Sequence, residues 1–550
     1  KFDKISLSNT AGMYTSLTIG PDGRLYALAN DGTIKRFPIN TNGTLGTPTL
    51  ITSLKTANGG TNRLAIGFAF DPSATATNLI AWVTHTYYAF TNAPDLTGKL
   101  TKLSGSSLQN VQDVLINLPR SAKDHVTNSI AFGPDGALYF SQGSCSAMGR
   151  ADQTWSNRNE HLLTAAVLRL DISKLGTLPL NVKTSESGGT YNPYNLNAPL
   201  TIYASGVRNA YDLVWHSNGS LYVPTNGSAA GGNTPASVNG TLRPNGTTYN
   251  GPSVPALTNV QQTQKDFLFR VLKGGYYGHP NALRGEYVMN GGNPTSGTDK
   301  AQVSAYPVGT APDVNWRGYA FDFQNNVSPN GAIEYKSSVF NGALKGKLLV
   351  VRYSQHDDII TLTPGTTKDI VSSKEGASIT GFSGFIDPLD ITENVKNGNI
   401  YVSEYGGSKI TLLRPRIGTT TVTAQKINAS EASSVSNSSN QFPSCDDTVA
   451  VMTSTENTVL QITDGSEKSK VNPNPVQRRF NIEFPAKYEG DFTLQIIDPS
   501  GKTFDIGKRR LKAGGSNIPV DLSMFSFKPG IYFLKIQSDS KTELIKLVKQ

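Results

Sequence analysis

Two short polar motifs in this 550-residue chain carry side chains that suit proton chemistry. The first is Lys123-Asp124-His125, and the second is Arg208-Asn209. A neutral imidazole titrates near a pH of about 6.5, so His125 could take a proton from a ligand hydroxyl at neutral pH. Two plainer interpretations stay open, namely that His125 is a hydrogen-bonded loop histidine and that Arg208 is a partner in a buried ion pair.

Side chains that bind metals are few and scattered. The chain has six histidines and two cysteines, Cys145 and Cys445, which argues against a zinc site built on cysteine pairs. The two cysteines either form one disulfide or stay free, because their spacing does not fix the geometry of a bridge. His356 beside Asp357-Asp358 suggests a metal site, but solvated acids in a turn are the favoured interpretation.

The elements that must position these residues are predicted from a repeated turn. An Asp-Gly or Asn-Gly pair is followed by one further residue, an aliphatic residue and a tyrosine. Such pairs supply the positive-φ positions of a tight hairpin, and the alternating residues after them predict a strand that enters a core. The four copies are Asp22–Tyr26, Asp135–Tyr139, Asn218–Tyr222 and Asn397–Tyr401.

A second repeated pattern is a short strand with Lys, Arg or Thr between aliphatic residues. We expect these strands to be the outer strands of six sheets. The six copies are Thr33–Phe37, Lys99–Leu103, Val167–Leu170, Phe267–Val271, Ile359–Leu362 and Lys409–Leu413. Their spacing exceeds a minimal four-stranded repeat, so long inserted loops are implied. The pattern predicts an all-β fold with a six-bladed β-propeller over residues 1–415, and a large β-sandwich is the alternative.

The rest of the chain has a different composition. Residues 416–470 are rich in Ser, Thr and Asn, which is typical of a linker. Residues 471–550 show clear alternating strands, which predict a small C-terminal β-sandwich. Most of the net charge of +9 falls in residues 466–550, so the larger domain is not a nucleic-acid binder. No stretch of apolar residues is long enough for a transmembrane helix, and the absence of an initial Met or leader suggests a mature chain.

The C-terminal module resembles the type A sorting domain of the type IX secretion system. Its matching segments are Asn472-Pro473-Asn474-Pro475, Leu494–Lys502, Val520-Asp521-Leu522-Ser523, Pro529-Gly530-Ile531-Tyr532 and Lys546-Leu547-Val548-Lys549. The resemblance implies export through the periplasm and the outer membrane, with the protein released or held at the cell surface. It also implies that an outer-membrane translocon and its barrel shuttle protein recognise residues 471–550.

The larger domain resembles the soluble glucose/sorbosone dehydrogenases that depend on pyrroloquinoline quinone (PQQ), a family of six-bladed propellers. The matching segments are Ile66–Pro72, Lys123–His125, Ile130–Tyr139, Ala204–Asn209 and Lys273–Asn281. The resemblance implies that His125 is the general base for oxidation of a sugar hydroxyl and that Arg208 lies beside the reacting groups. It implies cofactor contacts from Asn209 and Asn226, carbonyl ligands for Ca²⁺ from Gly227 and Ser228, and matches at Asp266 and Tyr277.

Several positions depart from that family. Ser144 stands where the family has the acid that orients the base, and a serine cannot stabilise an imidazolium as a carboxylate does. Cations that would neutralise the tricarboxylate cofactor are missing from Val350–Ser354, and Asp387-Pro388-Leu389 replaces paired arginines. Arg352 or Lys409 is the candidate substitute. Buried carboxylates without partners are unfavourable by several kcal/mol per ion.

Two functions therefore remain. The first is a secreted sugar dehydrogenase that uses PQQ and Ca²⁺. The second is a catalytically inactive propeller that binds a carbohydrate or a protein at the cell surface, for example in adhesion or gliding motility.

Overall fold

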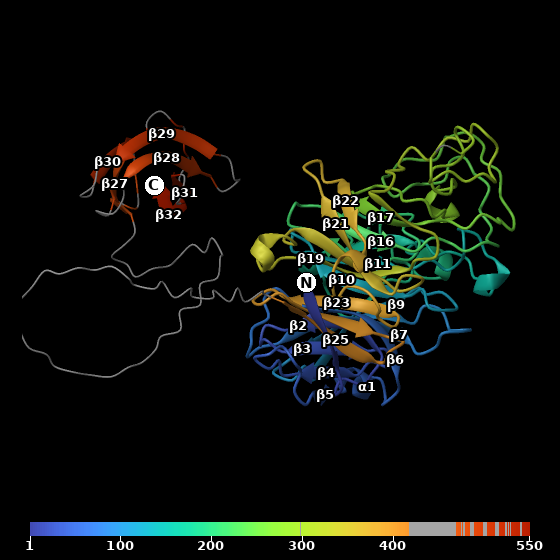
Figure 1. The fold of residues 1–550 in the computed structure, drawn as a ribbon. Coiled ribbons are helices and arrows are strands. Elements are labelled where there is room, and N and C mark those ends of the chain that lie inside the picture. The colour runs from blue at the N-terminus through green and yellow to red at the C-terminus, as the bar shows by residue number, and fades with distance from the viewer. Residues whose placement is uncertain are drawn as a thin grey trace, which may run out of the picture. The chain divides into compact units, whose positions relative to one another are not determined.

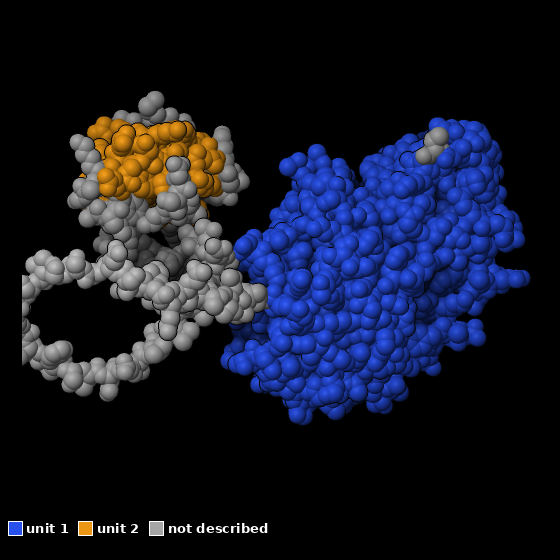
Figure 2. Space-filling model, in the orientation of Figure 1, with its two compact units in different colours: residues 1–418 blue, residues 419–550 orange. Residues whose placement is uncertain are grey.

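A computed structural model divides the chain into two compact units, residues 1–418 and 419–550 (Figure 2). In the first unit it describes residues 1–297 and 299–416. In the second it describes residues 469–472, 474, 476, 479–484, 489–498, 503–511, 516–522, 525, 527, 530–538 and 542–549. The predicted linker, residues 416–470, lies outside the described residues except at its ends, and its boundaries remain predictions.

The strands of the first unit form six sheets within its described residues. The first sheet holds β2 (Tyr14–Ile19), β3 (Leu25–Ala29), β4 (Ile34–Phe37) and β5 (Thr49–Ile51). The second holds β6 (Arg63–Phe70), β7 (Ile80–Tyr87), β8 (Gly98–Ser104), β9 (Asn110–Leu118) and β13 (Leu180–Asn181). The third holds β10 (Thr127–Phe132), β11 (Leu138–Gln142), β12 (Ala166–Leu170) and β14 (Leu200–Ser205).

The remaining three sheets follow the same order along the chain. The fourth holds β15 (Val214–Trp215), β16 (Leu221–Thr225), β17 (Asp266–Val271) and β18 (Phe321–Gln324). The fifth holds β19 (Pro329–Tyr335), β20 (Lys347–Arg352), β21 (Asp358–Pro364) and β22 (Ile370–Lys374). The sixth holds β23 (Pro388–Asn394), β24 (Asn399–Glu404), β25 (Lys409–Pro415) and β1 (Phe2–Leu7), so the two ends of the unit share a sheet (Figure 1).

The helices of the described residues are short. They are α1 (Ser53–Ala57) and the 3-10 turns η1 (Gln153–Trp155), η2 (Ile172–Lys174), η3 (Ser185–Ser187), η4 (Ala282–Arg284), η5 (Phe340–Gly342) and η6 (Gly376–Ser378). None of the helices in this part of the chain has the length and apolar character needed to span a membrane.

The repeated turn begins the second strand in four of the sheets, as predicted. Its tyrosine is fully or almost fully buried in each copy, and its glycine adopts a positive φ of between 71° and 80°. In the third sheet the Tyr139 hydroxyl donates to Asp135 at 2.9 Å, while Asp135 also binds Arg169. The turn acid thus ties its hairpin to the next strand, which explains why this residue pattern recurs at one place in the fold.

The second repeated pattern lies in six different sheets, but the prediction that these are outer strands is wrong. The copies fall on β4, β8, β12, β17, β21 and β25, and each of these strands is paired on both sides. A further strand covers the outside of each one, and in the sixth sheet this strand is the N-terminal β1. The Lys and Arg residues of the pattern lie on partly exposed faces, whereas Thr101, Thr361 and Thr411 are buried, so the pattern does not mark a sheet edge.

Hydrogen bonds join several neighbouring sheets near their first strands. Leu17 N–H on β2 donates to Asp390 on β23 at 2.6 Å, and Thr15 Oγ1 donates to the carbonyl of Ala65 on β6 at 2.7 Å. Ala332 N–H on β19 donates to Asp212 at 2.8 Å, and β19 in turn packs beside β23. These contacts bring loops from several sheets to one central region.

The second unit contains two sheets within its described residues. One holds β26 (Lys470–Asn472), β27 (Arg479–Phe484) and β30 (Ser516–Asp521). The other holds β29 (Thr503–Leu511), β28 (Gly490–Ile497), β31 (Gly530–Gln537) and β32 (Thr542–Lys549) in that order. Side chains from both sheets, among them Phe480, Ile482, Leu494 and Leu534, form one buried cluster.

Candidate functional site

His125 lies in the loop between β9 and β10, and its backbone is held in place from two sides. Ser121 Oγ accepts the N–H groups of Lys123 and His125 at 3.1 and 3.0 Å. The fully buried guanidinium of Arg120 donates to the carbonyls of Lys123, Tyr87 and Ala89. The loop that carries the predicted base is therefore fixed by hydrogen bonds to protein groups.

The hydrogen bonds of His125 fix which ring nitrogen carries the proton. Nδ1 lies 3.0 Å from Ser144 Oγ and 3.2 Å from the Ser144 carbonyl. The Ser144 hydroxyl donates its own proton to the carbonyl of Ser146 at 3.0 Å. Because both groups near Nδ1 can then only accept, Nδ1 must donate, and the neutral ring keeps its lone pair on Nε2.

The surroundings keep this imidazole neutral. Burial lowers the pKa of His125 well below its ordinary value of 6.5, and the positive charge of Arg208 lowers it further. The ring also packs on Trp155, with the ring centroids 4.1 Å apart. Nε2 makes no hydrogen bond with any described residue, and His125 lines the space beside it.

That space is a cavity of about 520 Å³ in the central region of the first unit. It is lined by Thr15, Leu64, Ile66, Phe90, Asp124, His125, Asn128, Asn209, Tyr211, Asn226, Ser328, Asn330, Tyr353, Leu389 and Tyr405. Asp124 is the one carboxylate in this lining, and no lysine or arginine from the described residues contributes to it. The cavity lining is thus partly polar and partly apolar, and none of its described side chains is a lysine or an arginine.

Backbone hydrogen bonds bring the predicted motifs together at this cavity. Ser144 N–H donates to the carbonyl of Arg208 at 2.8 Å, and Asn226 N–H donates to the carbonyl of Asn209 at 3.0 Å. Gly143 allows the close approach, because an added Cβ would lie 2.8 Å from both Asn209 Oδ1 and His125 Cβ. The structure therefore places His125, Asn209 and Asn226 around one cavity.

Asn209 offers hydrogen-bond donors next to the acceptor of His125. Asn128 Nδ2 donates both to the carbonyl of Ala210 and to Asn209 Oδ1, each at 2.9 Å. The amide oxygen of Asn209 is therefore the group that faces Asn128. Its Nδ2 group has no hydrogen-bond partner among the described residues. One acceptor and one donor group thus lie on the same cavity wall.

Arg208 lies behind this wall and is bound to carbonyl groups. Its Nε donates to Ala147 at 3.0 Å and its NH1 to the carbonyl of Gly227 at 2.8 Å. The guanidinium also lies over the ring of Trp155, 5.6 Å from the centroid. Burial lowers the pKa of Arg208 to about 10. The ion-pair interpretation is not realised within the described residues, because no carboxylate there lies within 4.0 Å of the guanidinium.

The carbonyl groups of the two residues predicted to ligate Ca²⁺ already accept hydrogen bonds from protein groups. The Gly227 carbonyl accepts from Arg208, and the Ser228 carbonyl accepts from Gln264 N–H at 2.7 Å. Asp266 accepts the N–H groups of Gly227, Val327 and Ser328 at 2.7 to 2.8 Å.

Tyr277 also has a structural role. Its hydroxyl accepts Leu272 N–H and donates to the carbonyl of Arg270, both at 2.8 Å. These contacts support the fourth sheet and leave the hydroxyl without a free proton for a ligand.

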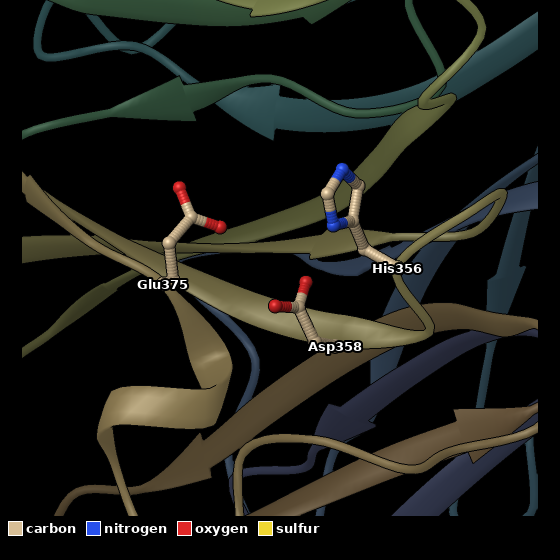
Figure 3. Close-up of side chains that lie close together, drawn as sticks. All are labelled: His356, Asp358 and Glu375. Carbon is tan, nitrogen blue, oxygen red and sulfur yellow. The ribbon is translucent and has the colours of Figure 1, made fainter.

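Arg352, the predicted substitute cation, lies on β20 and lines a different cavity. Its guanidinium binds both oxygens of Asp358 at 2.7 and 2.6 Å and also contacts Glu375. His356, Asp358 and Glu375 approach one another closely enough to suggest a metal site, as Figure 3 shows. Asp358 is buried on β21, so the interpretation of it as a solvated turn acid is wrong, and both carboxylates share the single guanidinium of Arg352.

Two groups that support the site were missed by sequence reasoning. The buried Glu160 accepts the N–H groups of Cys145 and Ser146 at 3.0 and 2.9 Å, and it pairs with His279 at 3.0 Å. It therefore holds the segment that follows Ser144. Trp155 is the second missed group, and no spacing in the sequence connects it to His125.

Several of the sorting-signal residues lie at or near strand ends in the second unit. Asn474 Oδ1 accepts Val548 N–H at 2.8 Å, and Asp521 pairs with Arg479 at 2.8 Å. Gly530 pairs with Lys549 at one end of the β31–β32 ladder. Of the others, Asn472 ends β26, Tyr532 is buried, Lys546 lies on β32, and Pro473 and Pro475 fall outside the described residues.

Cys145 is buried and forms no disulfide with any described residue. Its predicted alternative partner, Cys445, falls outside the described residues, so the choice between a disulfide and two free thiols stays open.

Comparison with protein families identifies both parts of the chain. The model of the family described as "Glucose / Sorbosone dehydrogenase" matches residues 13–364, which is more than half of the chain. The chain therefore belongs to this family. The model of the "Secretion system C-terminal sorting domain" matches residues 470–550. This domain marks the protein for export by type IX secretion to the cell surface or the medium.

Solved structures similar to the chain include PQQ-bound aldose sugar dehydrogenase from Streptomyces coelicolor, with 16% identity and a TM-score of 0.43 over 75% of this chain and 98% of that one. The PQQ domain of pyranose dehydrogenase from Coprinopsis cinerea has 11% identity and a TM-score of 0.47 over 75% and 95%. A calcium structure of a family AA12 enzyme from Trichoderma reesei has 15% identity and a TM-score of 0.45 over 75% and 95%. A search of curated proteins finds no match.

The residues around His125 do not fit PQQ and Ca²⁺, the cofactor and metal that the sequence resemblance led us to expect. Three carboxylates would enter a cavity whose described lining offers Asp124 and no cation to neutralise them. A Ca²⁺ ion on the Gly227 carbonyl would lie next to the Arg208 guanidinium, which already binds that oxygen. The site instead suits a ligand without net negative charge.

Proposed function

We propose that this exported protein binds a neutral sugar or a related polyol in the cavity beside His125. The observation that carries the proposal is that His125 and Asn209 line the same cavity, and that His125 Nε2 and Asn209 Nδ2 have no hydrogen-bond partner among the described residues. A sugar hydroxyl both donates and accepts, so it can satisfy the two groups at once. The protein then acts as a surface or secreted carbohydrate-binding module.

The rest of the cavity supports a carbohydrate ligand. Leu64, Ile66 and Phe90 offer apolar surface for the C–H face of a sugar ring. Asp124 offers carboxylate oxygens that accept hydrogen bonds from hydroxyl groups. The same carboxylate repels an anionic ligand, which favours a neutral one.

We also infer the architecture of each unit and the partners of the second one in export. The ring of neighbouring first strands supports six blades of a propeller, with the cavity near its axis. The cluster shared by the two sheets of the second unit supports a β-sandwich. For export, the proposed partners of residues 471–550 are the outer-membrane translocon and its barrel shuttle protein.

Saturation-transfer NMR on the full chain tests the ligand proposal. D-glucose, D-galactose, D-mannose and D-xylose are compared with the anionic D-glucuronate. We expect at least one neutral sugar to bind, glucuronate to bind more weakly, and Asn209→Ala to weaken sugar binding about tenfold through loss of the hydrogen bonds. Asn110→Ala, an exposed change on β9, is the matched control. Equal sugar binding by wild type and Asn209→Ala would contradict the proposal.

A second candidate function is oxidation of the bound sugar. Family membership favours it, and the unprotonated Nε2 of His125 is an atom that could accept the hydroxyl proton. Reduction of a redox dye by the full chain supplied with PQQ, Ca²⁺ and the bound sugar tests it. Dye reduction that is lost in His125→Ala and kept in His356→Ala would establish this function in place of simple binding.

A further inference from the structure

A second group of side chains, outside the His125 cavity, forms a hydrogen-bonded Ser–His–Asp arrangement. Ser187 Oγ lies 2.8 Å from His161 Nδ1, and His161 Nε2 lies 2.7 Å from Asp95 Oδ2. Serine, imidazole and carboxylate at these separations form the arrangement that activates a serine hydroxyl for nucleophilic attack.

The hydrogen-bond partners of His161 determine which of its ring nitrogens carries the proton. The Asp95 carboxylate can only accept, so Nε2 of neutral His161 carries the proton and Nδ1 keeps the lone pair. The Ser187 hydroxyl therefore donates to Nδ1. Glu186 does not compete, because its Oε1 lies 3.9 Å from Nδ1 and already accepts from Leu162 N–H and Thr184 Oγ1.

The fold holds all three residues through contacts of their own. β13 adds to β9 in parallel as the fifth strand of its sheet, and this pairing carries the chain to η3, which ends at Ser187. Asp95 Oδ1 accepts Leu96 N–H at 2.7 Å and Arg120 N–H at 3.2 Å, which orients the carboxylate.

The charge around the imidazole supports its use as a base. Burial lowers the pKa of His161, but the hydrogen bond and negative charge of Asp95 outweigh this effect and raise it above 6.5. Glu186 and Glu160 add to the rise, and Arg158 lies 3.7 Å from Asp95. An imidazolium formed by proton transfer from Ser187 is therefore stabilised.

A large cavity adjoins the His161 and Asp95 side chains, and Ser187 is the next residue after Glu186, which also lines it. The cavity has a volume of about 760 Å³. Pro235, Ala236, Ala256 and Leu283 give it an apolar wall. The exposed side chains of Arg150 and Asn159 also line it, and neither has a hydrogen-bond partner among the described residues.

We propose that Ser187, His161 and Asp95 form a second site that hydrolyses short-chain acyl esters. Ser187 Oγ attacks the ester carbonyl carbon while its proton passes to His161 Nδ1, and Asp95 positions the imidazole. Collapse of the intermediate breaks the bond to the alcohol oxygen, which takes the proton from His161. Water then attacks the acyl carbon and gives a proton to His161. The bond from the acyl carbon to Ser187 Oγ breaks, His161 returns the proton to Oγ, and the carboxylic acid leaves.

Covalent labelling of the full chain with a fluorophosphonate probe, followed by peptide mass spectrometry, tests the site without any variant. The proposal expects the adduct on Ser187. Hydrolysis of 4-nitrophenyl acetate is measured alongside, and Ser187→Ala is expected to lower its rate about 100-fold. Ser185→Ala, an exposed change in the same turn, is expected to keep both labelling and rate.

Either of two results would overturn the proposal. One is the absence of an adduct on Ser187 in the wild-type chain under conditions that label a known serine esterase. The other is an ester hydrolysis rate that Ser187→Ala and Ser185→Ala leave equally unchanged. Sugar binding at His125 is independent of both results, so the two sites are tested separately.

Discussion

At the scale of single residues, Ser144 decides what His125 can do. A carboxylate in that place would stabilise an imidazolium, whereas a serine hydroxyl that donates to Ser146 only holds the neutral ring in one tautomer. Together with burial and Arg208, this contact makes His125 a hydrogen-bond acceptor at neutral pH. The residue is therefore better suited to holding a hydroxyl group than to storing a positive charge.

Ser144→Ala tests this role of the hydroxyl. The variant keeps the Ser144 carbonyl as an acceptor for Nδ1 but loses the shorter contact to Oγ, so the ring is held less firmly. We expect sugar affinity to fall about fivefold, which corresponds to roughly 1 kcal/mol for one hydrogen bond. Titration of the NMR signal of the bound sugar measures it, with the exposed Ser373→Ala as control. Unchanged affinity in Ser144→Ala would show that the carbonyl alone fixes the ring.

At the scale of elements, two buried carboxyl groups, Asp390 and Asp212, interact electrostatically where neighbouring sheets meet. Burial raises the pKa of Asp390, and repulsion from Asp212 raises it further. Burial also raises the pKa of Asp212. Both groups accept backbone N–H groups from the next sheet, so they join neighbouring sheets while resisting ionisation.

This pair predicts a pH dependence of folding stability. A carboxyl group whose pKa is raised by folding stays protonated in the folded state above pH 3.8, where the unfolded chain releases the proton. Stability is therefore lost as pH rises from about 4 through the raised pKa. We expect Asp390→Asn to remove part of this loss, so that its melting temperature exceeds that of wild type at pH 8 but not at pH 4.

Thermal unfolding monitored by circular dichroism at the two pH values measures the effect. The exposed Asp369→Asn serves as control because it removes a carboxylate without changing the buried pair. A wild-type melting temperature that rises steadily between pH 4 and pH 8 relative to Asp390→Asn would rule out this account.

The elements also show how far the sequence alone can be taken. The turn repeat and the strand repeat located the hairpins because their residues obey local rules of φ and alternation. The order of strands within each sheet could not be read in the same way, since the N-terminal β1 covers β25 from the far end of the unit. The parallel addition of β13 likewise depends on tertiary contacts.

The candidate site likewise contains some residues that sequence motifs predict and others that they do not. His125, Asn209 and Asn226 were predicted from motifs, and the structure brings them together. Trp155 and Glu160 come from the long loop after β11, whose path no periodic pattern encodes. The function of Arg352 could not be judged from sequence either, because its partners Asp358 and Glu375 become neighbours only through pairing of β20, β21 and β22.

At the scale of the whole molecule, a glucose/sorbosone dehydrogenase domain is joined to a secretion sorting domain. Each has its own buried core, so ligand binding and export are separable properties. Deletion of residues 470–550 is expected to leave the protein in the periplasm. Cell fractionation and surface proteolysis measure this. The full-length Asn209→Ala chain is the control and is expected to reach the surface, and surface display of the deletion variant would refute the expectation.

The most direct test of the central claim is titration calorimetry on the purified full chain with two ligands in turn. The first is PQQ with excess Ca²⁺, and the second is the neutral aldose that gives the strongest saturation transfer. We predict saturable binding of the aldose and no saturable heat from the quinone. Micromolar binding of PQQ, about −8 kcal/mol, combined with no binding of any neutral sugar, would contradict the account.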